Sequence, residues 1–178
     1  PNLKILVSTR GLGPAVTCIL TNHQGNGVSA HSTRLNLEDT ILNSISEACR
    51  VAHASIRKAH WKDTFILKNF EEGEIDPNAH ALYYAYHEPF PSWMFGEIES
   101  FERVKEIWNE KIRNCLEDKQ FVYQKVMSVP INAGFIRHPQ ALTLRWKTTN
   151  LKILAQEEGI RRLNLKLEMI NEKPHIVS

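Results

Sequence analysis

The chain has 178 residues, of which 42% are apolar and 24% charged, and these values are ordinary for one folded domain with its own core. The 22 basic and 20 acidic residues leave a net charge of +2, which argues against a nucleic-acid binder because such a protein carries a clear basic excess. No apolar run approaches the roughly 20 residues that a membrane helix needs, so no membrane partner is expected.

The first sixty residues predict an antiparallel hairpin followed by a long helix. Residues 3–7 and 15–20 are short apolar runs separated by a glycine- and proline-containing turn at 11–14. Residues 36–56 are predicted to form a helix that Asn36 caps. Apolar residues recur in this helix at spacings of three and four, namely at Leu37, Ile41, Ile45, Ala48, Ala52 and Ile56.

Between the hairpin and the helix lies a small, polar segment punctuated by glycine. Residues 25–33 read GNGVSAHST and are predicted to form a turn or loop, with a third strand near Val28. A glycine-rich loop before a helix offers backbone N–H groups and a partial positive charge to an anion. The side chains that could add to such a site are Asn26, Ser29, His31, Ser32 and Thr33. Ordinary turn chemistry explains the same residues and is favoured from the residues alone.

The second half predicts further strands and one clear helix. Residues 80–86 are aromatic and apolar and are expected to be a strand, and Ser100 can cap a helix whose buried side is Phe101, Val104, Trp108, Ile112 and Cys115. Further strands are expected at 121–129, 142–146 and 161–169, with a short helix at 151–158. The whole chain is therefore predicted to be a single α+β domain, with a mainly antiparallel sheet and two or three helices packed on one side.

Cysteine and histidine do not indicate a metal site. Cys18, Cys49 and Cys115 are odd in number and widely separated, a pattern typical of buried thiols in a reducing cytoplasm. The histidines show no metal-ligand spacing. His53 and His60 share a helix face, but a solvated helix side explains them better than a shared ligand does.

Three segments carry a resemblance to a known family. They are Gly27-x-Ser29-Ala30-His31 with Ser46-Glu47-Ala48 on the following helix, the sequence DPNAHALYYA at 76–85, and the ending Lys-Pro-His at 173–175. In this order they resemble the C-terminal half of the YcaO superfamily, and in particular the azoline-forming cyclodehydratases of ribosomally made peptide natural products such as bacteriocins.

The sequence also departs from that family. Two Glu-rich helices of the family's earlier half have no counterpart, the chain begins at Pro1, and the last proline of the family's tail is absent. We therefore expect half of a YcaO-like fold, either a fragment or one half of a split protein.

The resemblance implies an ATP- and Mg²⁺-dependent reaction. A Cys, Ser or Thr side chain of a precursor peptide attacks the preceding carbonyl, ATP phosphorylates the resulting oxygen, and elimination leaves a thiazoline or oxazoline ring. Glu47 matches the glutamate of the S-E-A pattern and would bind Mg²⁺, whereas Arg50, Arg57, Asn26, Ser29 and His31 would contact ATP phosphates. The competing interpretation makes Glu47 a solvated carboxylate and pairs the arginines with surface acids.

The expected partners are the precursor peptide and the missing N-terminal half or a partner subunit, and a second copy of this chain is a further candidate. Two other functions stay open. One is a non-catalytic module of the same fold that docks a partner subunit or a leader peptide. The other is a small-ligand-binding α+β domain that shares only the helix pattern.

Overall fold

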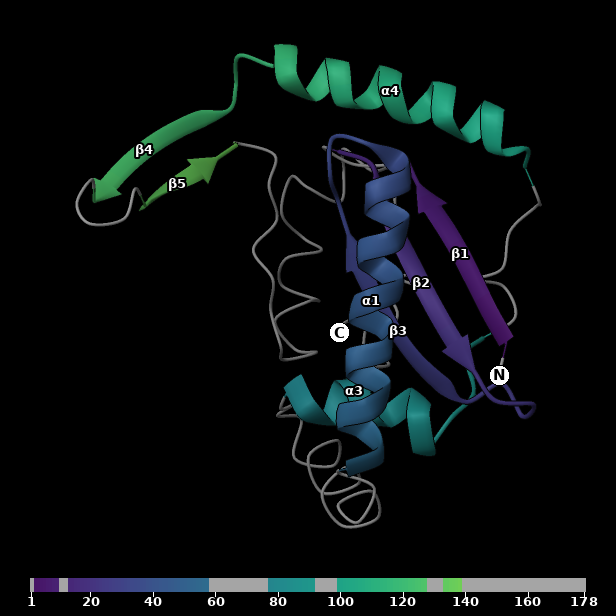
Figure 1. The fold of residues 1–178 in the computed structure, drawn as a ribbon. Helices are drawn as coiled ribbons and strands as arrows, with labels where there is room; N and C mark the ends of the chain where they lie inside the picture. The colour runs from purple at the N-terminus through teal and green to yellow at the C-terminus, as the bar shows by residue number, and fades with distance from the viewer. Residues whose placement is uncertain (1, 10–12, 58–76, 92–98, 128–132, 139–178) are drawn as a thin grey trace, which may run out of the picture.

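The computed structural model describes residues 2–9, 13–57, 77–91, 99–127 and 133–138. Three strands and a long helix come first, two helices follow, and a hairpin ends the described part (Figure 1). The elements in chain order are β1 (Asn2–Ser8), β2 (Ala15–Thr21), β3 (Gly27–Ser32), α1 (Leu37–Arg57), α3 (Pro77–Tyr86), α4 (Phe101–Glu117), β4 (Val122–Met127) and β5 (Ala133–Arg137).

The main sheet is antiparallel, in the order β1-β2-β3. Its first two strands confirm the predicted hairpin, with Asn2 opposite Thr21 and Ser8 opposite Ala15. Strand β3 confirms the third strand expected near Val28, but it also occupies residues 27–32 of the segment predicted to be a loop. The turn between β2 and β3 is therefore shorter than predicted. It contains Gly25, whose positive φ of 85° suits glycine.

Helix α1 confirms the predicted helix almost residue for residue. The Asn36 side-chain oxygen accepts a hydrogen bond from the Asp39 N–H at 3.0 Å, as an N-cap should. The predicted apolar stripe is confirmed at Leu37 and Ala48, which are buried, and at Ile41 and Ile45, which pack against the core, but it is wrong for Ile56, which is exposed. The buried residues are Leu37, Thr40, Ser44, Ala48 and Ser55.

The expectation of a strand at 80–86 is wrong, because these residues belong to helix α3. The helix begins at Pro77, where a missing N–H costs nothing, and alanines with high helix propensity follow. The aromatic side chains that suggested a strand are buried on this helix instead, and Leu82, Tyr83 and Tyr84 pack together with Ile19 of β2.

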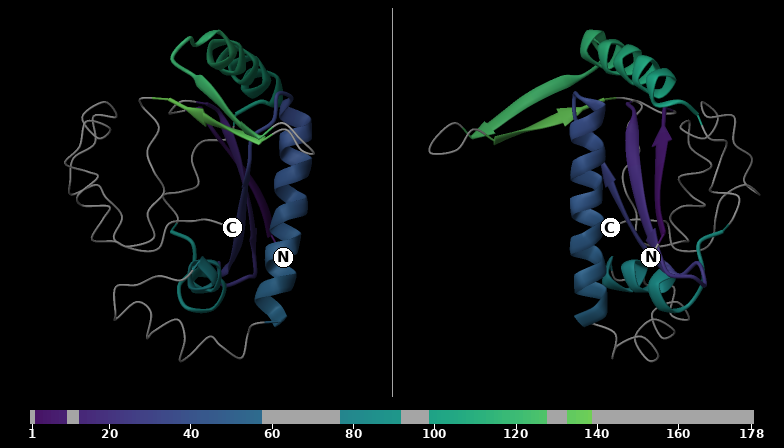
Figure 2. Two further views of the ribbon diagram at one scale, coloured as in Figure 1. Left: turned by 90° about the vertical axis from the view of Figure 1, so that its left-hand side faces the viewer. Right: turned by 45° about the vertical axis from the view of Figure 1, so that its right-hand side comes forward.

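The predicted α+β class is confirmed, but the helices are divided between the two faces of the sheet. Val16 packs with Leu37 of α1 and with Trp108 of α4. Because side chains alternate along a strand, Ile19 lies on the opposite face, where it contacts α3. Figure 2 shows α1 and α3 on either side of the sheet seen edge-on, with α4 crossing one end.

Helix α4 confirms the second predicted helix and its cap. The Ser100 hydroxyl accepts a hydrogen bond from the Arg103 N–H at 3.3 Å. Trp108 is fully buried, and its Nε1 donates to the Leu35 carbonyl at 3.3 Å. Of the other residues expected on the buried side, Val104, Ile112 and Cys115 are half-buried and Phe101 is exposed.

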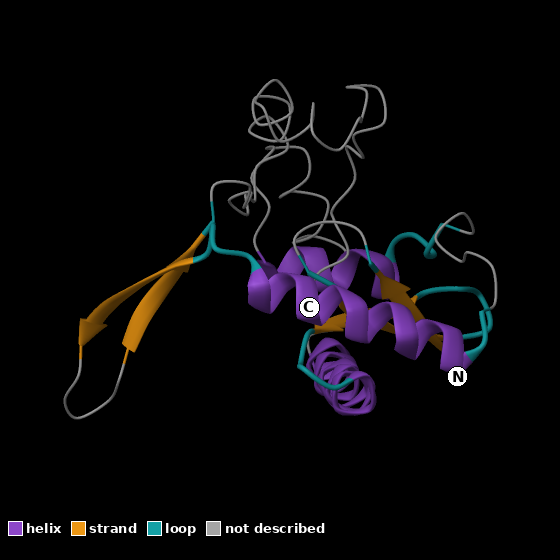
Figure 3. Ribbon diagram, turned by 90° about the horizontal axis from the view of Figure 1, so that it is seen from above, coloured by secondary structure: helices purple, strands orange, loops and turns teal. Residues whose placement is uncertain are grey.

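The β4–β5 hairpin stands away from the sheet (Figure 3). Strand β4 confirms the described part of the strand predicted at 121–129. At the hairpin's base, the His138 Nε2 lies 3.1 Å from an oxygen of Asp118, the residue that ends α4. The predicted elements at 142–146, 151–158 and 161–169, and the ending at 173–175, lie outside the described residues.

The helices in the described part of the chain are too short or too polar to cross a lipid bilayer.

Glu38 of α1 and Lys105 of α4 form an ion pair that links the two helices. The hydrogen bond from Lys105 is the largest cause that lowers the pKa of Glu38. A lowered pKa means that the pair stabilises the fold above the ordinary glutamate pKa of about 4.3, and that this stabilisation disappears as the pH falls through the folded-state value.

We therefore expect Glu38→Gln to lower the melting temperature at pH 7, and to lower it progressively less as the pH falls through the folded-state pKa of Glu38. Thermal unfolding followed by circular dichroism from pH 7 to pH 3 measures the difference. Glu106→Gln is the control, because Glu106 forms an exposed pair with Arg103 and such pairs contribute little. A Glu38→Gln difference that stays constant from pH 7 to pH 3 contradicts the assignment.

Candidate functional site

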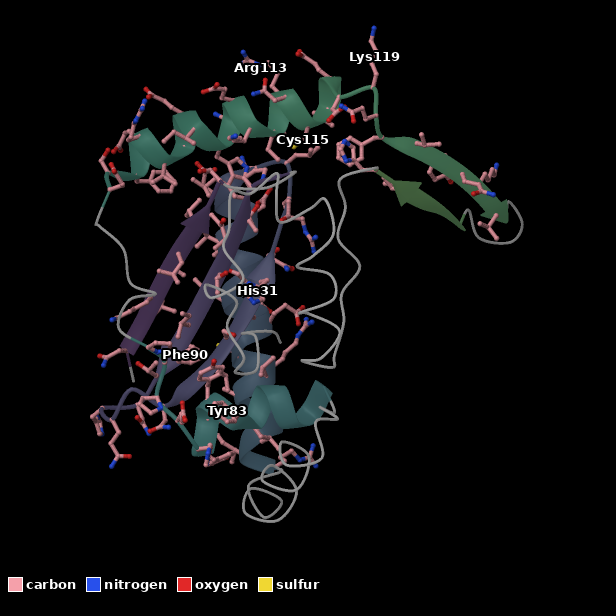
Figure 4. The ribbon with its side chains drawn as sticks, turned by 180° about the vertical axis from the view of Figure 1, so that it is seen from behind. His31, Tyr83, Phe90, Arg113, Cys115 and Lys119 are labelled. Atoms are coloured by element: carbon pink, nitrogen blue, oxygen red, sulfur yellow. The ribbon has the colours of Figure 1, made fainter. Side chains whose placement is uncertain are left out.

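Strand β3 presents its predicted site residues on the face away from α1. Ala30 packs with Ala48 of α1, and the Ser32 hydroxyl accepts a hydrogen bond from Asn43 of α1 at 3.0 Å. Alternation along the strand therefore turns Ser29 and His31 toward the opposite face. Figure 4 shows His31 from that side, on the same face of the sheet as Tyr83 and Phe90.

The side chains of β3 already have local roles. Ser29 is buried, and the His31 Nδ1 is hydrogen-bonded at 2.7 Å to the Thr17 hydroxyl on the neighbouring strand. Thr17 and His31 are directly opposite each other in the register of β2 and β3. Since Ser29 and His31 lie in a strand, their backbone does not form the anion-binding loop that the sequence suggested.

Asn26 lies in the turn and connects it to α3. Its N–H donates to the Asn22 side chain at 3.1 Å, and its side-chain amide donates to the Tyr84 carbonyl at 3.4 Å. Next to it, the Gly25 carbonyl accepts a hydrogen bond from the Phe90 N–H at 3.1 Å. Asn26 thus holds two segments of the chain together.

Glu47 and Arg50 form an ion pair on α1, with 2.7 Å between the Arg50 Nη1 and the Glu47 Oε1. The Arg50 side chain is 72% exposed and that of Glu47 37% exposed. This is the surface pairing that the sequence offered as the alternative to phosphate binding. Arg57 lies in the last turn of α1 and is exposed, about 15 Å along the helix from Glu47.

The predicted site residues therefore lie in three separate places. Glu47, Arg50 and Arg57 belong to α1 on one side of the sheet, Ser29 and His31 face the other side, and Asn26 lies in the turn before β3. Within the described ranges, no three His, Cys, Asp or Glu side chains are grouped so as to hold a metal ion. Glu47 is a single carboxylate, whereas Mg²⁺ normally uses several oxygen ligands, so these residues do not by themselves make a magnesium site.

The structure brings together a junction that the sequence did not predict. Turn 22–26, the C-terminal half of α1 and helix α3 meet beside β3. The Tyr86 hydroxyl donates to the Ser55 carbonyl of α1 at 2.9 Å. The rings of Tyr84 and Phe90 stack with their centroids 4.7 Å apart. The tyrosines in 82–86 were the sequence feature that could have indicated this junction, since the hydroxyl of a buried tyrosine usually finds a hydrogen-bond partner.

Burial raises the pKa of one group at this junction and of one in the core. Burial is the main cause that raises the pKa of Tyr83 far above its ordinary value, and a hydrogen bond with Glu88 adds to it. Burial, followed by the nearby Cys49, raises the pKa of the Cys18 thiol to about 11. A thiol with this pKa is a poor nucleophile at neutral pH.

The expectation of buried thiols is confirmed for Cys18 alone. Cys115 is half-buried, and the expectation is wrong for Cys49, which is exposed. Cys49 is exposed because it lies on the side of α1 that faces away from the sheet.

Comparison of the chain with protein-family models, with curated proteins and with solved structures finds no match in any of the three.

We expect the 178-residue chain to bind Mg²⁺–ATP weakly, at millimolar concentrations or above. The predicted phosphate-binding residues lie on opposite sides of the sheet, and Arg50 is paired with the one candidate metal carboxylate. Isothermal titration of the chain with ATP and MgCl₂ measures the affinity. Saturable binding in the micromolar range contradicts this expectation.

Proposed function

We propose that this chain is the C-terminal part of a YcaO-like, ATP-dependent cyclodehydratase that forms azoline rings in a precursor peptide. The observation that carries the proposal is the junction beside β3. Residues 27–31 and 76–85, the two longest segments that resemble the family, are about fifty residues apart in sequence, and helix α3, the described part of the second segment, packs against β3.

Hydrogen bonds at and beside these segments support the proposal. The Asn26 side chain donates to the Tyr84 carbonyl, and the Phe90 N–H donates to the Gly25 carbonyl. The Tyr86 hydroxyl reaches the Ser55 carbonyl on α1, two turns beyond Glu47. The two segments on which the resemblance rests therefore lie at one place in the fold.

The residues of this chain would then serve the reaction through charge and position. In the reaction, a substrate Cys, Ser or Thr attacks the preceding carbonyl, and the resulting oxygen is activated by phosphate transfer from ATP. Glu47 supplies an accessible negative charge on a rigid helix, and Arg50 and Arg57 supply positive charges that suit phosphate. The remaining metal and phosphate ligands would come from the N-terminal half of the fold or from a partner subunit.

The second candidate is a non-catalytic module of the same fold that docks a partner subunit or a leader peptide. The β4–β5 hairpin favours it, because a two-stranded hairpin is marginally stable alone and this one exposes large apolar side chains. These are Phe121, Val122, Tyr123, Val126 and Ile136.

The substitution Glu47→Gln in the complete enzyme separates the two functions. Glutamine keeps the volume of the side chain and removes its charge. If Glu47 contributes to the ATP site, ATP turnover with the precursor peptide should fall by about a hundredfold or more. Stability should change by no more than about 0.5 kcal/mol, since the side chain is on the surface.

Glu106→Gln is the matched control, because Glu106 forms the same kind of ion pair with an arginine three residues away, on α4. We expect turnover in this variant to equal that of the wild type. Normal turnover in Glu47→Gln removes Glu47 from the site. Binding of the precursor peptide without ATP turnover in the unmodified complete protein favours the docking module.

A further inference from the structure

The outward side of α1 carries a line of apolar residues along its length. Leu42 is 66% exposed and Ile56 71% exposed. Cys49 lies midway between them, seven residues from each, and is also exposed. In Figure 1 α1 lies in front of the sheet, and Figure 2 shows it at the outer boundary of the described elements.

The spacing of this line is that of a coiled-coil seam. Leu42, Cys49 and Ile56 follow one another at intervals of seven residues, one heptad, which keeps all three on one side of a helix that faces another helix. We call these three residues the α1 seam. The side of α1 that packs on the sheet is made by other residues, among them Leu37, Ser44, Ala48 and Ser55, and Ile45 also packs there, against Cys18, Ala30 and Ala48. The seam is therefore a second apolar side of α1, beyond the one that packs on the sheet.

The charges at the two ends of α1 favour one particular partner. The first turn is acidic, with Glu38 and Asp39, and the last turn contains Arg57. Glu38 is paired with Lys105, so Asp39 is the exposed acid beside the seam. A second copy of α1 running antiparallel would bring the Arg57 end of one helix to the Asp39 end of the other, and the helix dipoles would also oppose each other favourably.

We propose that α1 forms the interface of an antiparallel homodimer in which the α1 seams of two copies pack against each other. The seam is symmetric about Cys49. A two-fold axis through Cys49 therefore sets Leu42 of one copy against the partner's Ile56, and Ile56 against the partner's Leu42. In this register Arg57 lies about two residues, or about 3 Å along the axis, from the partner's Asp39. One self-complementary patch is what a two-fold dimer requires.

The charges also disfavour the parallel arrangement, because it would bring the two acidic ends together and align the dipoles. The seam spans only two heptads, so the dimer should be weak and dependent on concentration.

Sedimentation equilibrium of the 178-residue chain tests the association. The mass should rise with concentration from the 20.5 kDa of one chain toward twice that value. Leu42→Lys should weaken association about tenfold or more, because it puts a charge in the seam. Leu116→Lys is the matched control, since Leu116 is 71% exposed on α4 and lies outside the seam. Equal association of the two variants, or a monomer at every soluble concentration, overturns the proposal.

Oxidative cross-linking tests the register independently. With a copper–phenanthroline oxidant, the two Cys49 thiols should lose two electrons and two protons to form one intermolecular disulfide, seen as a dimer band without reductant. Cys49→Ser should abolish the band, whereas Cys115→Ser should retain it.

Two paired variants determine the direction of the helices. In a Cys49→Ser background, a chain with Leu42→Cys should not cross-link to itself, but it should cross-link when mixed with a chain carrying Ile56→Cys. Self-cross-linking of the Leu42→Cys chain at the mixed-pair rate indicates parallel helices and overturns the antiparallel proposal.

Discussion

The close packing of α1 on the sheet through small side chains is the constraint on which the other contacts depend. Ala48 meets Cys18 of β2 and Ala30 of β3, and all three are fully buried. Small residues on both surfaces allow the helix axis to approach the sheet closely, as in other tightly packed interfaces. This approach determines where the ends of α1 lie, so that Leu37 reaches Trp108 and Ser55 reaches Tyr86.

A face made of small residues brings polar groups into the interior, and local hydrogen bonds satisfy them. The Thr40 hydroxyl donates to the Asn36 carbonyl at 2.6 Å and accepts from the Arg34 N–H at 3.0 Å. The Ser44 hydroxyl donates to the Ile41 carbonyl at 2.8 Å. Because these hydroxyls have partners, burying them costs little. The packing also leaves larger apolar residues, such as Leu42 and Ile56, on the outside of α1.

The features with strong local signals could be predicted from the sequence. These features depend on residues close together in the chain. They are the Asn36 cap of α1, the spacing of apolar residues along α1, the hairpin of β1 and β2, and the Ser100 cap of α4. Helix α3 was not predicted, because the aromatic residues of 80–86 suit a strand as well as a helix and outweighed the weaker local helix signal of Pro77 and the alanines. The burial of this helix against Ile19 depends on tertiary contacts that the sequence does not show. The grouping of the candidate site residues could not be predicted for a similar reason. Neighbouring residues such as Ala30 and His31 point to opposite faces, and their separation becomes clear only when the strand register and the position of α1 are known.

Replacing Ala48 by leucine tests the central claim most directly, because it lengthens a fully buried side chain of α1 that packs with both Cys18 and Ala30. Ala54→Leu is the comparison, since Ala54 is on the same helix and exposed and the helix propensities of the change are the same. In urea unfolding, the close-packing account predicts that Ala48→Leu lowers the free energy of unfolding by about 1–3 kcal/mol and that Ala54→Leu changes it by no more than about 0.5 kcal/mol. Equal stability of the two variants would contradict the claim that small side chains hold α1 against the sheet.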